Sequence, residues 1–246
     1  MQNLKILKMK KLYMLRYFIN ILFIACSITG FSQEDIPIDS IPTKTTYGIK
    51  IGIDISKQIR MLTESNYKGI VFTGDYRILD RLFVAAEFGS EEKKTINEVL
   101  DFNTDGTFLK LGVNYNVYNN RKGLDNEIYV GFRYGVAKFN QKLNSYTIHD
   151  LDNYWDQNNV NSITDFKNLT ASWFELVLGF NAEILKNTYM GLSLRLNRLL
   201  NQKNPENFSN LYIPGFNKVL EENNFGVGIT YSIFYQIPIF KKNKKI

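Results

Sequence analysis

The chain has 246 residues, of which 14% are aromatic and 22% charged, and its mean hydropathy is −0.22. This length suits one barrel or one to two ordinary domains, and a helical membrane protein would be far more apolar. The formal net charge of +6 is misleading, because five of the 30 basic residues and none of the 24 acidic residues lie in residues 1–32. The rest of the chain is nearly neutral, which argues against a nucleic-acid surface.

The first 32 residues are typical of a secretory signal peptide. A basic stretch precedes an apolar run, and Gly30 and Ser32 stand at positions −3 and −1 of a cleavage site. Translation could start at Met1 or at Met9. Two alternatives stay open: an uncleaved helical anchor, and lipidation at Cys26, the only cysteine of the chain.

Residues 33–46 are polar and interrupted by proline, which predicts a short linker rather than a domain. Eight segments with alternating apolar and polar residues follow, and because side chains alternate across a strand, each predicts a strand with one apolar and one polar face. We expect these strands to form a barrel over residues 47–240, followed by a basic tail at 241–246. The eight segments are 47–56, 68–78, 81–89, 107–118, 127–138, 172–184, 189–198 and 224–237.

The connections between these segments alternate in length. Outer-membrane barrels have short periplasmic turns and longer external loops, and an even number of strands brings both chain ends to the periplasmic side. The pattern therefore predicts an all-β fold, an eight-stranded antiparallel up-and-down transmembrane β-barrel with short periplasmic turns and long external loops, preceded by a periplasmic linker at 33–46. The connections are 57–67, 79–80, 90–106, 119–126, 139–171, 185–188 and 199–223.

Alternation alone does not decide which row faces inward, because soluble barrels of the lipocalin type alternate too, with the apolar row inside. Here the polar rows are rich in glycine and carry six basic and five acidic residues. Charges inside a dry lumen must pair, and near-balance makes pairing feasible. We therefore expect the aliphatic rows to face lipid. The charged residues are Arg81 and the predicted lumen network: Lys50, Asp54, Asp75, Arg77, Glu87, Lys110, Arg133, Glu175, Glu183 and Arg195.

Tyrosines of the apolar rows are candidates for the aromatic girdles that flank the lipid-facing band of such barrels. They are Tyr47, Tyr115, Tyr134, Tyr231 and Tyr235.

Several stretches resemble small outer-membrane β-barrel proteins of Gram-negative bacteria, and more narrowly one of their uncharacterised families with a domain of unknown function. They are the signal ending GFSQ, the strands FLKLGVNYNVY and EIYVGFRYGVA, and the last strand NFGVGITYSIFY. That last strand is similar to the barrel-assembly signal of these proteins, although Phe240 and a lysine-rich tail follow it. The resemblance implies the barrel-assembly machinery as a partner, and it implies no activity and no site residues.

Signals for chemistry are weak. His149 is the only histidine and lies in the longest predicted loop, near Ser145, Asp150 and Asp152, but sequence neighbours do not make a nucleophile and its base. A solvated loop histidine is the simpler interpretation, and a lipid-modifying enzyme is the alternative.

A second weak signal is the opening half of a calcium loop. It consists of Asp101, Asn103, Asp105 and Gly106, but Gly112 stands where the closing acid should be. An Asp-Gly turn into the fourth strand explains the residues better. The segment with Asp150, Asp152 and Asp156 fails in the same way.

Six aromatic residues of the predicted loops could form a binding surface, or could let the loops fold over one another and cap the barrel mouth; we favour the cap. They are Tyr154, Trp155, Phe166, Phe208, Tyr212 and Phe216.

Together these patterns predict a non-enzymatic outer-membrane barrel with a structural or loop-mediated binding role. Eight strands leave a lumen that side chains fill, so we expect no open pore. We expect no cofactor, outer-membrane lipid as a partner, and an unidentified extracellular ligand or protein at the loops. The alternatives are a lipid-modifying enzyme that uses His149 and a soluble periplasmic ligand-binding barrel.

Overall fold

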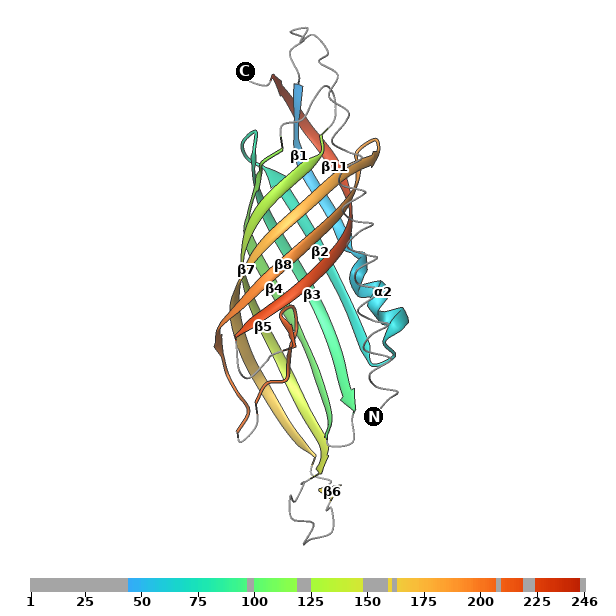
Figure 1. The fold of residues 1–246 in the computed structure, drawn as a ribbon, viewed down its shortest axis with the longest axis vertical. Coiled ribbons are helices and arrows are strands. Elements are labelled where there is room, and N and C mark those ends of the chain that lie inside the picture. Colours follow the sequence, from blue (N-terminus) through green and yellow to red (C-terminus); the bar gives the residue numbers. More distant parts are fainter. Residues whose placement is uncertain are drawn as a thin grey trace, which may run out of the picture. The chain divides into compact units, whose positions relative to one another are not determined.

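The computed structural model describes residues 44–96, 100–118, 125–147, 159–160, 163–206, 209–218 and 224–243. The predicted signal peptide and most of the predicted linker lie outside these segments. Eight long strands dominate the described chain (Figure 1): β1 (Lys44–Asp54), β2 (Tyr67–Arg77), β3 (Leu82–Ile96), β4 (Leu100–Asn116), β5 (Glu127–Thr147), β7 (Thr164–Leu185), β8 (Thr188–Gln202) and β11 (Phe225–Asn243). The smaller elements are α2 (Ile55–Thr63), β6 (Asn159–Val160), β9 (Tyr212–Ile213) and β10 (Asn217–Lys218).

The eight long strands form one closed antiparallel ring. Each pairs with the long strand before and after it along the chain, and β1 pairs with β11 to close the circle. Figure 1 shows the strands strongly tilted around the barrel, with α2 beside the wall. The predicted eight-stranded antiparallel up-and-down barrel is therefore confirmed. None of the helices in the described segments is long and apolar enough to cross a membrane.

At the end of the barrel with the short turns, the boundaries of the six long strands from β2 to β8 agree with the prediction within about two residues, but β1 already starts at Lys44, in the predicted linker, and β11 continues to Asn243, in the predicted tail. At the other end the largest differences lie in the strands from β3 to β7. The predicted loop 90–106 is wrong, because β3 continues to Ile96 and β4 starts at Leu100. Likewise β5 and β7 take up much of the predicted loop 139–171. Beyond Ser90 the outward residues become polar, so the apolar row that marks a strand disappears although the strand continues. The helix α2 (Ile55–Thr63), which covers the end of the predicted strand 47–56 and much of the predicted loop 57–67, was also missed.

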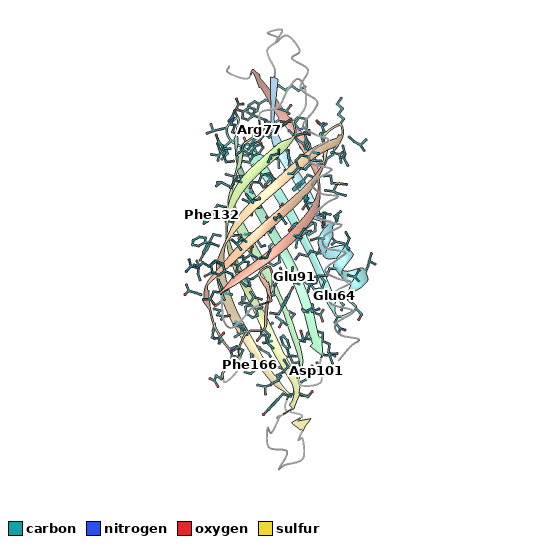
Figure 2. All side chains as sticks on the ribbon, viewed as in Figure 1. Glu64, Arg77, Glu91, Asp101, Phe132 and Phe166 are labelled. Carbon is teal, nitrogen blue, oxygen red and sulfur yellow. The ribbon has the colours of Figure 1, made fainter. Side chains whose placement is uncertain are left out.

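The outward face of the strands carries an apolar belt, defined as the outward aliphatic and aromatic residues of all eight strands. On β5 it runs from Ile128 to Val136, about nine residues, which at ~3.4 Å per residue and ~40° tilt is about 23 Å high. Leu111 in the middle of β4 is 52% exposed, whereas the inward Lys110 beside it is 5% exposed. The aliphatic row is thus outside and the charged row inside, and Figure 2 shows Phe132 on the outer side of the wall.

Past the belt, the same strands project beyond its edge at the end opposite the short turns. There the outward row is hydrophilic, as at Glu92, Lys138 and Asn140. The barrel wall therefore has an apolar part and a polar rim made of the same strands.

Four of the five predicted girdle tyrosines are exposed, and Tyr47 is the exception. The register between β1 and β11 shifts between Tyr47 and Gly48, and this irregularity breaks the alternation. Tyr47 is only 7% exposed, with its ring stacked on Phe240 and its hydroxyl hydrogen-bonded to Asp80 at 3.4 Å. The expectation that Tyr47 faces lipid is therefore wrong.

Glycines of the inward row make room for large rings that fill the lumen. A Cβ on Gly135 would lie 2.4 Å from the indole of Trp173, and one on Gly179 would lie 2.1 Å from the ring of Tyr129. Trp173 is fully buried and Tyr129 is nearly so. The strand backbone can approach these rings only where the residue has no side chain.

We predict that Gly135→Ala lowers the free energy of unfolding by about 1–3 kcal/mol, because the buried indole of Trp173 has no space to move. Gly228→Ala is the matched control, since a Cβ there meets its nearest neighbour at an ordinary 3.9 Å; it should stay within about 1 kcal/mol of the wild type. Equilibrium unfolding in detergent micelles measures both, and equal stability of the two variants would contradict the packing described above.

Candidate functional site

Charged side chains of five strands meet in the middle of the lumen. We call this group the central cluster: Glu87, Lys110, Arg133, Glu175 and Arg195, from β3, β4, β5, β7 and β8. The row that faces inward is continuous around the ring, and register places Glu87 opposite Lys110 and Arg133 opposite Glu175. Because side chains alternate between the two faces of a strand, each of these five strands places one member of the cluster in the lumen.

Arg195 contacts both glutamates of the central cluster. Its Nη1 lies 2.8 Å from Glu87 Oε2 and 3.1 Å from Glu175 Oε2. Lys110 Nζ lies 2.7 Å from Glu175 Oε1, and Arg133 Nε lies 3.6 Å from Glu87 Oε1. Each carboxylate is therefore shared between cations, which offsets the cost of removing it from water.

A second group, the turn-side cluster, lies nearer the short turns and consists of Lys50, Arg77, Asp125 and Glu127. Lys50 Nζ lies 2.6 Å from Glu127 Oε1, and Arg77 Nη2 lies 2.7 Å from Asp125 Oδ1. The Lys50 ammonium also lies 4.1 Å from the centre of the Tyr189 ring. Figure 2 shows Arg77 near this end of the barrel. The two clusters together hold seven of the ten predicted lumen residues.

The other three predicted residues are held by hydrogen bonds. Asp54 accepts a hydrogen bond from the Ser56 amide and caps the N-terminus of α2. Asp75 is buried and accepts a hydrogen bond from the Asn114 side-chain amide at 3.5 Å. Glu183 accepts one from the Asn187 amide at 2.9 Å in the β7–β8 turn, and it is only partly buried. Arg81, counted with the polar rows, is exposed in the β2–β3 turn.

Several residues of the lumen were missed. Glu127 has the same parity as Arg133 on β5, so strand alternation could have identified it. Trp173 donates a hydrogen bond to Glu175 Oε1 at 2.7 Å, but as an apolar residue in a polar row it gave no signal. Glu91 was missed because the predicted third strand ended at residue 89, two residues before it, whereas β3 continues to Ile96.

The lumen has little free volume. Arg133 is 3% exposed and Glu175 is 0% exposed, so the centre of the lumen is shielded from bulk solvent. Two cavities beside the central cluster measure about 30 Å³ and 10 Å³, which is room for about one water molecule each. Neither can hold a substrate. Within each cluster, opposite charges pair and so hold together the strands that carry them.

Above the central cluster, the described part of the β8–β11 connection folds into the barrel mouth. It contains the hairpin β9–β10, whose Ile213 and Phe216 are buried against Trp173 and other inward residues. Tyr212 is buried as well. These positions agree with the expectation that loop aromatics cap the mouth; Tyr154, Trp155 and Phe208 lie outside the described residues.

Glu91, beyond the apolar belt, anchors this hairpin. It accepts hydrogen bonds from the Tyr212 hydroxyl at 2.6 Å and from the Gly215 amide at 3.1 Å, and it pairs with Lys57 of α2 at 2.8 Å. Burial alone raises the pKa of Glu91, but the charge and hydrogen bond of Lys57 and the two hairpin donors outweigh it and lower the pKa to about 2. Burial and the nearby Glu91 raise the pKa of Tyr212. Glu91 therefore stays ionised and Tyr212 protonated, as this contact needs.

The weak chemical signals are only partly resolved. His149, Asp150, Asp152 and Asp156 lie outside the described residues. The calcium-loop residues from Asp101 to Gly106 lie within β4, so the predicted Asp-Gly turn is wrong. Within the described segments, no three His, Cys, Asp or Glu side chains are placed to hold a metal ion.

We predict that Arg195→Met lowers the free energy of unfolding by about 3–5 kcal/mol, because it leaves two buried carboxylates short of a partner. Adding Glu87→Gln should recover part of this loss. The control is Arg198→Met, which removes an exposed arginine of the same strand and should cost less than about 1 kcal/mol. Equilibrium unfolding in detergent tests the set; an Arg195→Met protein as stable as Arg198→Met would show that the cluster is not needed for stability.

Comparison with curated proteins gives no match. Among solved structures, the chain is similar to Ail, the attachment invasion locus protein of Yersinia pestis, with 8% identity and a TM-score of 0.36 over 80% of this chain and 100% of that one. It is also similar to Neisserial surface protein A, NspA (9% identity, TM-score 0.40, 79% and 99% covered), and to CarO of Acinetobacter baumannii (8%, 0.33, 78% and 98%). Because the similarity is so low, the fold rests on this chain's own strand pairing.

A family described as a domain of unknown function, DUF6048, matches residues 14–242, which is nearly the whole chain. The protein therefore belongs to the DUF6048 family.

Proposed function

We propose that this protein is a non-enzymatic outer-membrane barrel with a closed lumen, which is exported by its N-terminal signal peptide and acts structurally or by binding at its polar rim. One observation carries the proposal: the aliphatic row faces outward around the whole ring, while the ionic row is buried and paired inside it.

This orientation favours a lipid environment over water. Burying one Leu, Ile or Phe side chain is worth about 1.5–3 kcal/mol, and the belt leaves such residues exposed on every strand. In acyl chains the same residues are well solvated, and in the closed ring each long strand pairs with two neighbours. A soluble ligand-binding barrel needs the reverse orientation, with the aliphatic row around an internal cavity. The arrangement therefore supports a membrane protein against the soluble alternative.

The filled lumen supports a structural or binding role instead of passive transport. The central cluster is buried on all sides, and the hairpin β9–β10 covers it from the rim side. A water-filled channel would expose charged side chains, as in the much wider porins.

The polar rim is the part that would meet the exterior. Strands β3, β4, β5 and β7 extend beyond the belt there, and their rigid hairpins would hold the connecting loops away from the membrane surface. Loops held by such a scaffold are suited to binding an extracellular ligand or protein. The opposite end, with short turns, would face the periplasm, and β11 would supply the assembly signal.

The closed lumen leads to a first test. We predict that the protein, inserted into planar bilayers, produces no stepwise ion conductance, because the central cluster and the hairpin leave no continuous water path. Insertion is verified separately by protection of the barrel from protease in vesicles of the same lipid. Reproducible conductance steps from protease-protected protein would contradict the closed lumen.

The belt leads to a second test, with two arginine substitutions on the outward face of β4. Leu111→Arg places a charge at the middle of the belt and should lower the free energy of unfolding in lipid vesicles by about 2–4 kcal/mol. Thr107→Arg, four residues along the same row and just past the belt, should cost about 0–1 kcal/mol. Equal effects of the two substitutions would mean that no hydrocarbon layer surrounds the barrel.

A further inference from the structure

The barrel wall has a gap on the rim side, between β2 and β11. The pairing of β1 with β11 ends at Asp54 opposite Ser232, and the pairing of β1 with β2 ends at Ile53 opposite Phe72. Beyond these points both neighbours continue, β11 back to Phe225 and β2 back to Tyr67. No strand among the described residues lies between them there. We call this gap the notch.

Helix α2 occupies the notch with its polar side inward. Lys57 reaches inward to Glu91, and Arg60 donates a hydrogen bond to Asn217 Oδ1 at 3.3 Å and lies over the Tyr67 ring at 4.0 Å. The opposite side of the helix carries Ile59 and Leu62, which are 50% and 89% exposed. In Figure 1, α2 lies at the side of the barrel next to β2.

This orientation of α2 is reversed relative to a helix on a soluble protein, which buries its apolar side. It suits a helix at the membrane interface, where the apolar side meets acyl chains. Ile59 is exposed to a similar extent as the outward Ile49, Ile51 and Ile53 of β1, the strand that α2 follows directly along the chain.

A groove of about 850 Å³ opens between α2, the hairpin and the first residues of β11. Its mouth is formed by Val227 and Ile229, which are also part of the lipid-facing belt and are 74% and 55% exposed. Its walls combine two kinds of surface. The cations are Lys57, Arg60 and Lys93, and the apolar residues are Leu100, Phe102 and Leu211.

We propose that this groove binds a lipid of the surrounding leaflet that carries a phosphate on its head group, an inference that rests on the proposed membrane location. The head group lies at the three cations, and one acyl chain leaves through the notch between Val227 and α2. Lys93 stands five residues beyond Phe88 on β3, past the apolar belt and towards the polar rim. The groove therefore offers both kinds of surface that a phospholipid contacts, apolar residues next to the belt and cations.

Charge complementarity fits this occupant. Three carboxylates lie near the three cations: Asp54, which interacts electrostatically with Lys57, the buried Glu91, which pairs with Lys57 and the hairpin, and Glu64, whose side chain is 41% exposed. Hydrogen bonds and charge from Lys93 and Arg60 lower the pKa of Glu64, so it stays ionised. Glu64 is the most exposed of these carboxylates, and when it turns to solvent a phosphate can take its place at Arg60 and Lys93. A bridging phosphate gains charge-assisted hydrogen bonds from Arg60 and Lys93.

The test measures binding of dioleoylphosphatidylglycerol to the full-length protein in neutral detergent micelles by native mass spectrometry. We expect one lipid to bind with higher affinity than dioleoylglycerol, which has the same chains and no phosphate. We expect inorganic phosphate, which has no chain, not to displace it. Displacement by inorganic phosphate alone would overturn the lipid as occupant.

Two variants alter the groove in different ways, and a third is the control. Lys93→Gln removes a cation and should weaken lipid binding about 3- to 10-fold. Gly228→Leu keeps the charge but fills space at the groove wall, where a Cβ is tolerated, and should weaken binding to a similar extent. Lys94→Gln changes the neighbouring, outward lysine and should leave the affinity within about twofold of the wild type.

The outcomes separate this inference from the proposed function. If the protein inserts into vesicles and is protease-protected, but Lys93→Gln and Gly228→Leu both bind the lipid as Lys94→Gln does, the groove is not the binding site and the membrane barrel stands. If the wild type does not insert, both proposals fall. Loss of binding in either groove variant, with an unchanged far-ultraviolet circular dichroism spectrum, supports the groove.

Discussion

Electrostatic pairing without water is the constraint on which this structure depends. Inside the ring, the five residues of the central cluster form ion pairs with one another in a space that excludes bulk solvent. Arg195 pairs with two glutamates at once. Removing a carboxylate from water costs several kcal/mol, and only close, multiple partners offset that cost. The same requirement acts on the main chain, whose amides and carbonyls are satisfied by closure of the sheet between β1 and β11.

From this constraint the division of the barrel follows. Where the lumen is charged and tightly packed, the outer surface is aliphatic, and the glycines at Gly135 and Gly179 let aromatic rings complete the filling. Where the strands project beyond the belt, the outer surface becomes hydrophilic, and the interior changes from ionic clusters to an apolar core built by the hairpin, with Phe216 against Trp173. The lumen is thus filled by the charged central cluster in its middle and covered by the apolar core of the hairpin at its mouth.

Much of this organisation could be predicted from the sequence, because strand alternation acts locally. Ile51 and Leu111 mark the outward row, and Arg195 and Glu175 mark the inward one, without any knowledge of pairing. Alternation failed where a local irregularity shifted it, as at Tyr47, and where both rows are polar, as past Ser90, so that Glu91 was assigned to a loop. Helix α2 did carry a signal, the spacing of Ile55, Ile59 and Leu62 after the capping Asp54, but nine residues between two strands are easily taken for a connection. The hydrogen-bond donors of the hairpin to Glu91, Tyr212 and Gly215, are 121 and 124 residues away along the chain, and no local pattern encodes such contacts.

That separation bears on how the molecule is assembled. Glu91 receives its hydrogen bonds from a segment that follows seven of the eight long strands along the chain, and its cation from the helix after the first strand. The docking site of the hairpin β9–β10 is complete only when β2, β4, β5, β7 and β8 lie together, because the apolar residues that pack against Ile213 and Phe216 come from these five strands. Until Ile213 and Phe216 dock there, the barrel interior lacks the apolar core that covers the central cluster.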